Sequence, residues 1–344
     1  MVASADAPFA DPFRREIVGH RKSIRSVAWN VAGRKLASGS VDHTARVYDV
    51  EHGVRGGRDV ELKGHGDAVE HVCWDPTSPS ALATISSDKT LRLWDVRSGS
   101  SCVATVATAG DPINVVYRPD GAVVAVGDRD DVISFVDVRT REVLRTHKFP
   151  REVNELAWDA EGATLYCTTG QGTVEVLAYP DLKPLRTIEA HTHSVYCVAF
   201  DHERHRYALG SADALVSIWD AAEDVCLRTI ARVESPVRSV AFSRDGRFVA
   251  AGGEDARIDV ARVSDARSSN EAHSARPGVV TRIGADRYLA DVVDASPSSP
   301  AADRGSSASP FPLSSKYLAH VSAVSSLGSN LIANVALSPA CTNR

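Results

Sequence analysis

The sequence lacks the features that mark several protein classes. Its 39 lysines and arginines are outnumbered by 44 aspartates and glutamates, so the net charge of −5 offers no overall positive field to attract a polyanion. Its six cysteines lie far apart, without the Cys-x-x-Cys pairing of zinc and redox sites. We therefore expect no metal or cofactor, free thiols in a reducing compartment, and no direct binding of nucleic acid.

Signals for membrane targeting are also scarce. The N-terminal segment MVASADAPFADPFRRE contains two aspartates and no apolar run, so it predicts neither a secretory signal nor a membrane anchor. The uncharged residues 317–337 are long enough to span a membrane, but His320, Asn330, Asn334 and several serines interrupt them. We therefore expect an intracellular protein without a membrane partner.

What the sequence does contain is an internal repeat of about 42 residues. An aromatic residue closes a short apolar stretch six times, at steps of 45, 43, 41, 42 and 42 residues. A Gly- or Asp-containing turn and a second apolar run follow, then a third run whose last residues keep the same register, and in most units a fourth. The aromatic residues are Trp29, Trp74, Tyr117, Trp158, Phe200 and Phe242.

Four short strands in each unit are typical of a β-propeller blade. One four-stranded sheet cannot bury both of its faces, so the units must stack around a common axis. The sequence therefore predicts an all-β WD40-type β-propeller with six recognisable blades.

Histidines and aspartates recur at fixed positions in these units. His20, His65 and His191 each lie nine residues before the unit aromatic, and an aspartate lies seven residues before the end of the third run. We expect a histidine, an aspartate, a strand hydroxyl and an indole to form one buried hydrogen-bond network, with Ser86 or Ser87 as the hydroxyl in the second unit. The predicted network residues are His20, Asp42, Tyr48, His65, Asp88, Trp94, His191, Ser211, Asp213 and Trp219.

Two chemical alternatives use the same residues. Ser, His and Asp in one unit could form a hydrolase triad, but the set recurs in three units and no Gly-x-Ser-x-Gly elbow accompanies it. A metal site is disfavoured because one histidine per unit gives no convergent set of ligands. We therefore expect a protein that is not an enzyme, with no catalytic residue.

Residues near the predicted channel mouth are candidates for protein binding. They lie four residues before the unit aromatic or just before the turn aspartate, and mixed arginine, tyrosine and acidic side chains suit protein recognition. A merely solvated face remains the alternative for each. The candidate rim residues are Arg25, Glu70, Arg129, Asn154, Tyr196, Arg238 and Glu254.

The repeats are of the WD type, seen in GHGDAVEHVCWDPTSPSALATISSDKTLRLWDV. Over residues 14–263 the chain resembles the THO complex subunit 3 family. The resemblance is seen in the segments VAVGDRDDVISFVDV, EVNELAWD and YPDLKPLRTIEAH. The resemblance implies a seven-bladed, non-enzymatic scaffold in the nucleus, bound to other THO subunits within the TREX assembly of mRNA processing and export. It also implies that contact with mRNA is indirect. The alternative is a WD-repeat adaptor of another nuclear complex, such as chromatin or ubiquitin-ligase machinery.

The C-terminal part departs from the repeat. After Val263 the apolar alternation stops, and residues 295–315 are rich in Pro, Ser and Ala. We therefore expect an extension at 1–13, a propeller at 14–263 and a low-complexity, disordered tail at 264–344. We expect the N-terminal strand to serve as the closing strand, that is, as the outer strand of the last blade. Either six blades then close the ring, or the ring keeps seven-bladed geometry with a gap where one blade is missing; we favour the second.

Overall fold

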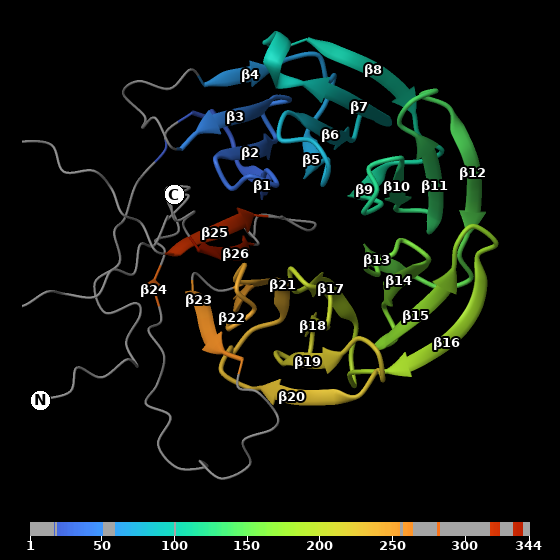
Figure 1. Ribbon diagram of the computed structural model, residues 1–344, viewed down its shortest axis with the longest axis vertical. Helices are drawn as coiled ribbons and strands as arrows, with labels where there is room; N and C mark the ends of the chain where they lie inside the picture. The colour runs from blue at the N-terminus through green and yellow to red at the C-terminus, as the bar shows by residue number, and fades with distance from the viewer. Residues whose placement is uncertain are drawn as a thin grey trace, which may run out of the picture.

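The structure, a computed structural model, confirms the predicted all-β propeller with six blades. It describes residues 17, 19–50, 59–99, 101–254 and 257–263, and the backbone of three further strands at 281–282, 317–323 and 333–339. Six antiparallel sheets of four strands each are arranged around a common axis (Figure 1). None of the described residues forms a helix long and apolar enough to cross a membrane.

Each blade consists of four strands in chain order, from the axis outwards. Blade 1 contains β1 (Ile24–Trp29), β2 (Lys35–Ser40), β3 (Ala45–Asp49) and β4 (Val60–Leu62). Blade 2 contains β5 (Val69–Trp74), β6 (Ala81–Ser86), β7 (Thr90–Asp95) and β8 (Cys102–Ala107), with the 3-10 turn Val96–Ser98 between the last two. Blade 3 contains β9 (Pro112–Tyr117), β10 (Val123–Asp128), β11 (Val132–Asp137) and β12 (Val143–Lys148).

The remaining three blades repeat this order. Blade 4 contains β13 (Val153–Trp158), β14 (Thr164–Thr169), β15 (Thr173–Ala178) and β16 (Lys183–Glu189). Blade 5 contains β17 (Val195–Phe200), β18 (Arg206–Ser211), β19 (Val216–Asp220) and β20 (Cys226–Ile230). Blade 6 contains β21 (Val237–Phe242), β22 (Phe248–Gly253), β23 (Arg257–Arg262) and the short β24 (Thr281–Arg282).

The hydrophobic core lies between consecutive blades rather than inside one. Between blades 3 and 4, for example, Phe135 and Trp158 are both fully buried, and their rings meet edge to face at 6.2 Å. Full burial of a side chain of this size contributes roughly 2 to 3 kcal/mol, which a single isolated sheet could not gain on both faces. Stacking is therefore what makes each blade stable.

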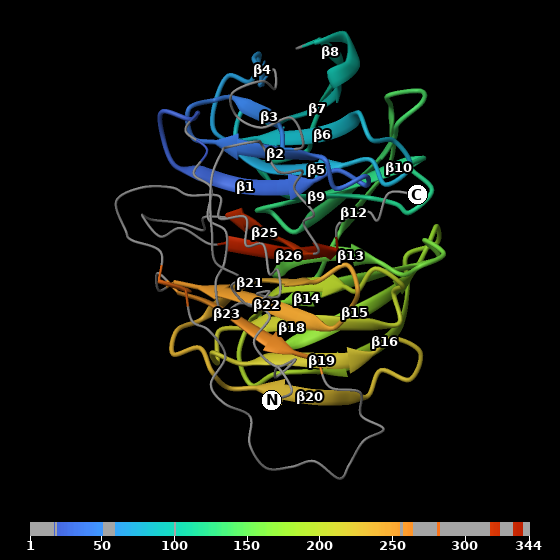
Figure 2. The ribbon, with the colours of Figure 1, turned by 60° about the vertical axis from the view of Figure 1, so that its left-hand side comes forward.

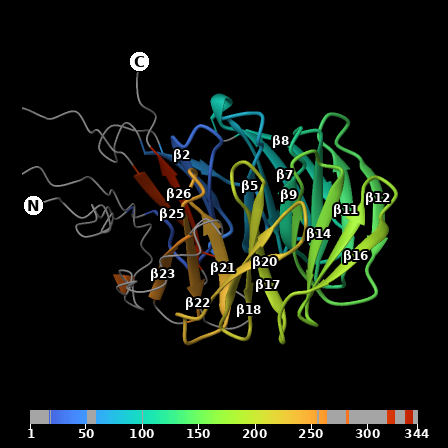
Figure 3. The same cartoon turned by 60° about the horizontal axis from the view of Figure 1, so that its bottom comes forward.

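The strands of each blade run between the two faces of the ring (Figure 3). Because neighbouring strands are antiparallel, the start of the innermost strand and the turn between the second and third strands lie on the same face. We call this the rim face, since the candidate rim residues lie there. The turns between first and second strands, and between third and fourth, lie on the opposite face.

Between blades 6 and 1 lies a two-stranded sheet in place of a seventh blade (Figures 1 and 2). It pairs β25 (Tyr317–Ala323) with β26 (Ala333–Pro339) in antiparallel register. β26 packs against β21 and β22, and β25 packs against β1. On the face opposite the rim, Arg244 Nη1 of blade 6 also donates a 3.2 Å hydrogen bond to the Val31 carbonyl of blade 1. The favoured gap between these blades therefore holds two strands and a bridging side chain.

Several predictions fall on parts of the chain that are not described. The extension at 1–13, most of the expected closing strand and most of the tail at 264–344 lie outside the described residues. Of the expected closing strand, Ile17 is buried against Val27, Leu36 and Tyr48 of blade 1. The domain boundaries stay predictions.

Candidate functional site

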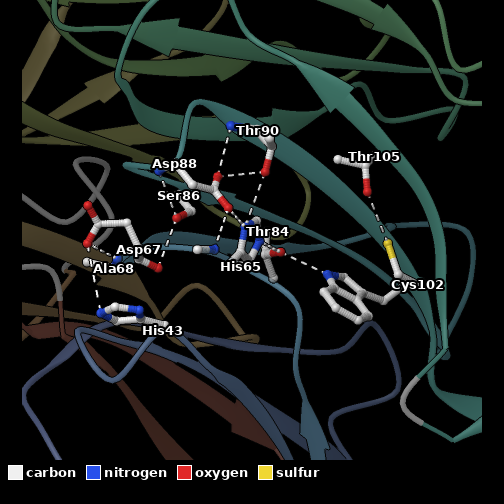
Figure 4. A network of polar contacts seen from close by, with 12 residues as sticks. His43, His65, Asp67, Ala68, Thr84, Ser86, Asp88, Thr90, Cys102 and Thr105 are labelled. Carbon is white, nitrogen blue, oxygen red and sulfur yellow. Dashed lines mark hydrogen bonds and ion pairs between the residues drawn. The ribbon is translucent and has the colours of Figure 1, made fainter.

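In blade 2, a histidine, a threonine, an aspartate and a tryptophan form one continuous hydrogen-bonded chain (Figure 4). His65 Nδ1 lies 3.0 Å from Asp88 Oδ2, and His65 Nε2 lies 2.7 Å from Thr84 Oγ1. The indole Nε1–H of Trp94 donates to the same threonine oxygen at 2.8 Å. Because the carboxylate can only accept, Nδ1 carries the ring proton and Nε2 accepts the threonine O–H.

The electrostatics of this chain keep the histidine neutral and the aspartate ionised. Burial lowers the pKa of His65, although the hydrogen bond and charge of Asp88 oppose this. Burial alone would raise the pKa of Asp88, but hydrogen bonds from Thr90, the Gly66 N–H and His65 outweigh it and bring the pKa to about 2. The polar groups of this network are thus satisfied by one another.

The same arrangement recurs in blade 5. His191 Nδ1 lies 2.9 Å from Asp213 Oδ2, and His191 Nε2 lies 2.7 Å from Ser217 Oγ. Trp219 Nε1–H donates to that serine oxygen at 2.7 Å. The network therefore joins the third strand, and the turn that precedes it, to the segment that enters the blade.

Blade 1 carries a version with tyrosine in place of tryptophan. His20 lies 3.0 Å from Asp42 and 2.6 Å from Ser38 Oγ, which also hydrogen-bonds the Tyr48 side chain. Burial lowers the pKa of His20 despite the neighbouring Asp42. A phenol can therefore replace the indole as the third member.

The hydroxyl member of the network differs from the sequence prediction. Ser211 does not bind the histidine ring; its Oγ donates to the His193 carbonyl at 3.2 Å and accepts the Asp213 N–H at 3.2 Å. Ser86 likewise donates to the Asp67 carbonyl at 3.0 Å. Ser86 and Ser211 are the last residues of their second strands and hydrogen-bond within the adjacent turn, whereas the indole reaches hydroxyls deeper in the blade. Ser87, the other predicted hydroxyl of blade 2, hydrogen-bonds Glu70.

Three of the rim residues are paired across or within blades 1 to 3. Arg25 of blade 1 lies 3.7 Å from Glu70 of blade 2, and Ser87 Oγ donates to the same carboxylate at 3.1 Å. Burial raises the pKa of Glu70, while Arg25 and Ser87 oppose the rise. In blade 3, Arg129 Nε donates to Asp111 Oδ2 at 2.6 Å. The charges on this side of the rim are therefore held by partners at fixed positions.

The rim on the side of blades 4 to 6 is also bridged between blades. Asn154 Nδ2 of blade 4 donates to the Val195 carbonyl of blade 5 at 2.9 Å. The Arg238 guanidinium of blade 6 lies 3.6 Å from the centre of the Tyr196 ring of blade 5, a cation–π distance. Glu254 accepts two N–H groups of Arg238, at 2.6 and 2.9 Å. Tyrosine and arginine are thus presented together in one orientation.

A further ring of residues, which we call the seam residues, was missed by the sequence analysis. They lie three residues before the unit aromatic, and several bind the backbone of the next blade's innermost strand. The Val72 N–H donates to Ser26, the Val115 N–H to His71 and the Val198 N–H to Glu155, at 3.3, 3.2 and 2.7 Å. The seam residues are Ser26, His71, Asn114, Glu155, Cys197 and Ser239.

The seam residues include a histidine and a glutamate whose pKa values are shifted by burial. Burial lowers the pKa of His71 to about 4, so its ring accepts the Val115 N–H in the neutral form. Burial raises the pKa of Glu155 to about 7, although the Val198 N–H favours the carboxylate. The fixed offset from the aromatic was visible in the sequence, but the residue type varies among the units, so no repeated motif marked it.

The described residues include no group of three or more His, Cys, Asp and Glu side chains that could hold a metal ion. The polar clusters that resembled catalytic sets are three copies of one internal network. Chemically, this arrangement can present a surface whose side chains are held in fixed positions by their partners.

In a comparison with known protein families, residues 20–280 match the THOC3 beta-propeller domain. The chain is 49% identical to "THO complex subunit 3" of Arabidopsis thaliana over 265 residues, which cover 77% of this chain and 84% of that protein. It is 32% identical to "WD repeat-containing protein AAC3" of Dictyostelium discoideum, over 69% of this chain and 54% of that one. It is 26% identical to "Striatin-4" of Homo sapiens, over 70% and 35% respectively.

Proposed function

Because the chain belongs to the THOC3 β-propeller family, we propose that it is a non-catalytic WD-repeat scaffold subunit of a THO complex. The family resemblance inferred from the repeats is confirmed by the match over residues 20–280. As a THO subunit, it would act in the nucleus, in the TREX assembly that couples transcription to mRNA processing and export.

The observation that carries this proposal is the bridged rim. Arg238, Tyr196 and Glu254 are held together by one cation–π contact and two hydrogen bonds. Tyrosine and arginine dominate the binding energy of protein interfaces, and side chains that are already ordered lose less entropy when a partner docks. The rim face is therefore suited to bind other THO subunits.

The charge of the chain supports an indirect role toward RNA. The net charge is −5, and the rim arginines are paired with acidic side chains. Sequence-independent affinity for nucleic acid needs cationic groups that neutralise phosphates and release counterions. We therefore assign mRNA contact to the partner subunits rather than to this propeller.

Affinity purification tests the proposal. The wild-type chain should recover other THO subunits from nuclear extract, and Arg238→Ala should recover several-fold less of them. The matched control is Arg97→Ala, which removes an exposed arginine paired with Asp95 on the opposite face. Recovery of chromatin or ubiquitin-ligase proteins without THO subunits would support the adaptor alternative and overturn this function.

A further inference from the structure

One seam residue differs from its counterparts in the other blades. Ser239 of blade 6 is fully buried, yet among the described residues its Oγ has no hydrogen-bond partner. Its equivalents Ser26 and Glu155 accept an N–H from the next innermost strand. The strand that follows blade 6 in the ring is β26, so β26 does not provide the contact that ties the other seams.

The sheet that contains β26 is also half the size of the others. β26 packs against the first two strands of blade 6, as an innermost strand does, and β25 packs against β1 of blade 1. In the described part of the chain no third strand pairs with β25, whereas each of the six blades has four strands. Within the described residues, the edge of β25 that does not pair with β26 therefore presents backbone N–H and C=O groups without a sheet partner.

The other blades show what the third position requires. Third strands are five or six residues long and mostly buried, because blades press on both of their faces. They contain β-branched, leucine and aromatic residues and most end in aspartate, as in VISFVD of β11 and VSIWD of β19. A strand entering the seventh place would need the same chemistry.

We propose that the seventh place of the ring is a strand-accepting site, in which an extended apolar segment of a partner protein pairs with the edge of β25 that β26 leaves free. This rests on the proposed scaffold function and extends it by naming how one partner is held. Main-chain hydrogen bonds provide the affinity, and the adjacent walls of blades 1 and 6 select β-branched and aromatic side chains. The partner strand supplies the third strand that the seventh sheet lacks among the described residues.

A peptide tests the site without any other subunit. The probe is a synthetic copy of residues 132–137, VISFVD, flanked by lysines for solubility; its control carries Phe135→Pro, which cannot continue a ladder. With the full chain we expect saturable binding of the probe and about tenfold slower amide exchange in β25. The outer strand β12 is the internal control, because it also has an exposed edge, and its exchange should not change. Absence of binding, or protection of β12 instead of β25, overturns the inference.

Exchange in the purified THO assembly separates this inference from the proposed function. If β25 is protected in the assembly relative to the isolated chain, the strand-accepting site is supported. If the assembly forms but β25 exchanges as it does in the isolated chain, the site is refuted while the scaffold function stands. If no assembly forms, the scaffold function fails, and the peptide experiment still decides the site.

Discussion

The backbone N–H of Val198 in blade 5 donates a 2.7 Å hydrogen bond to the carboxyl group of Glu155 in blade 4. This contact joins two blades through an acid whose pKa burial raises from 4.5 to about 7. Glu155 is thus a titratable group at a seam where Ser26 and Asn114 serve in other blades.

The raised pKa of Glu155 predicts a pH-dependent stability. Between about pH 4.5 and 7 the folded chain keeps a proton that the unfolded chain has released, so the free energy of unfolding falls as pH rises and levels off above this window. Glu155→Gln keeps an acceptor for Val198 and should be more stable than wild type by about 1 kcal/mol above neutral pH. Urea unfolding from acidic to alkaline pH measures this, with the exposed Glu152→Gln as control. A wild-type pH slope retained in Glu155→Gln would contradict the assignment.

The network of blade 2 predicts a large effect of removing one hydroxyl. Thr84→Val keeps the side-chain volume but leaves the Trp94 N–H and the His65 ring nitrogen without a partner. We expect a loss of about 2 to 3 kcal/mol in the free energy of unfolding, measured by chemical denaturation. Thr105→Val on the exposed outer strand of the same blade should change it by less than about 0.5 kcal/mol. Equal effects of the two substitutions would show that Thr84 is not a buried member of the network.

The seam residues predict opposite outcomes for two serines. Ser26→Ala removes the acceptor of the Val72 N–H and should cost about 1 kcal/mol of stability. Ser239→Ala removes a buried hydroxyl that has no partner among the described residues and should be neutral or slightly stabilising. Thermal unfolding of the two variants side by side measures the difference. A loss at Ser239 as large as that at Ser26 would mean that the seventh place does supply a bond.

The rim predicts that arginine cannot be replaced by lysine at position 238. Lysine keeps the charge but cannot stack on Tyr196 while donating two N–H groups to Glu254. We expect Arg238→Lys to weaken binding to THO partner subunits several-fold, measured by interferometry with purified proteins, while the melting temperature stays unchanged. Arg97→Lys on the opposite face is the control. Unchanged affinity of Arg238→Lys would remove this part of the rim from the interface.

Much of the fold followed from the spacing of aromatic residues. Each predicted unit aromatic, from Trp29 to Phe242, is the last residue of an innermost strand. The spacing works because every blade must place a large side chain at the same depth between its neighbours. Each histidine is likewise separated from its aspartate by the first two strands of one blade, so local spacing located the pairs.

Contacts that depend on depth or on the next blade could not be predicted in this way. Ser86 and Thr84 lie on the same strand two residues apart, and only the reach of the Trp94 indole decides which of them it binds. The bond from Val198 to Glu155 joins separate repeat units, so its geometry depends on how the sheets stack. The chemistry at the seam positions varies from serine to glutamate, because any acceptor of suitable length serves there.

The hydrogen bond from Arg244 to the Val31 carbonyl joins residues 213 positions apart in the chain. The more extensive strand contacts among the six blades otherwise join consecutive blades, so an arc of stacked sheets can grow one unit at a time at modest entropic cost. Bringing blade 1 against blade 6 and against the sheet of β25 and β26 joins the segments of greatest sequence separation, so these contacts should form last. Folding kinetics of this protein should therefore show an early compact arc and a slow final circularisation.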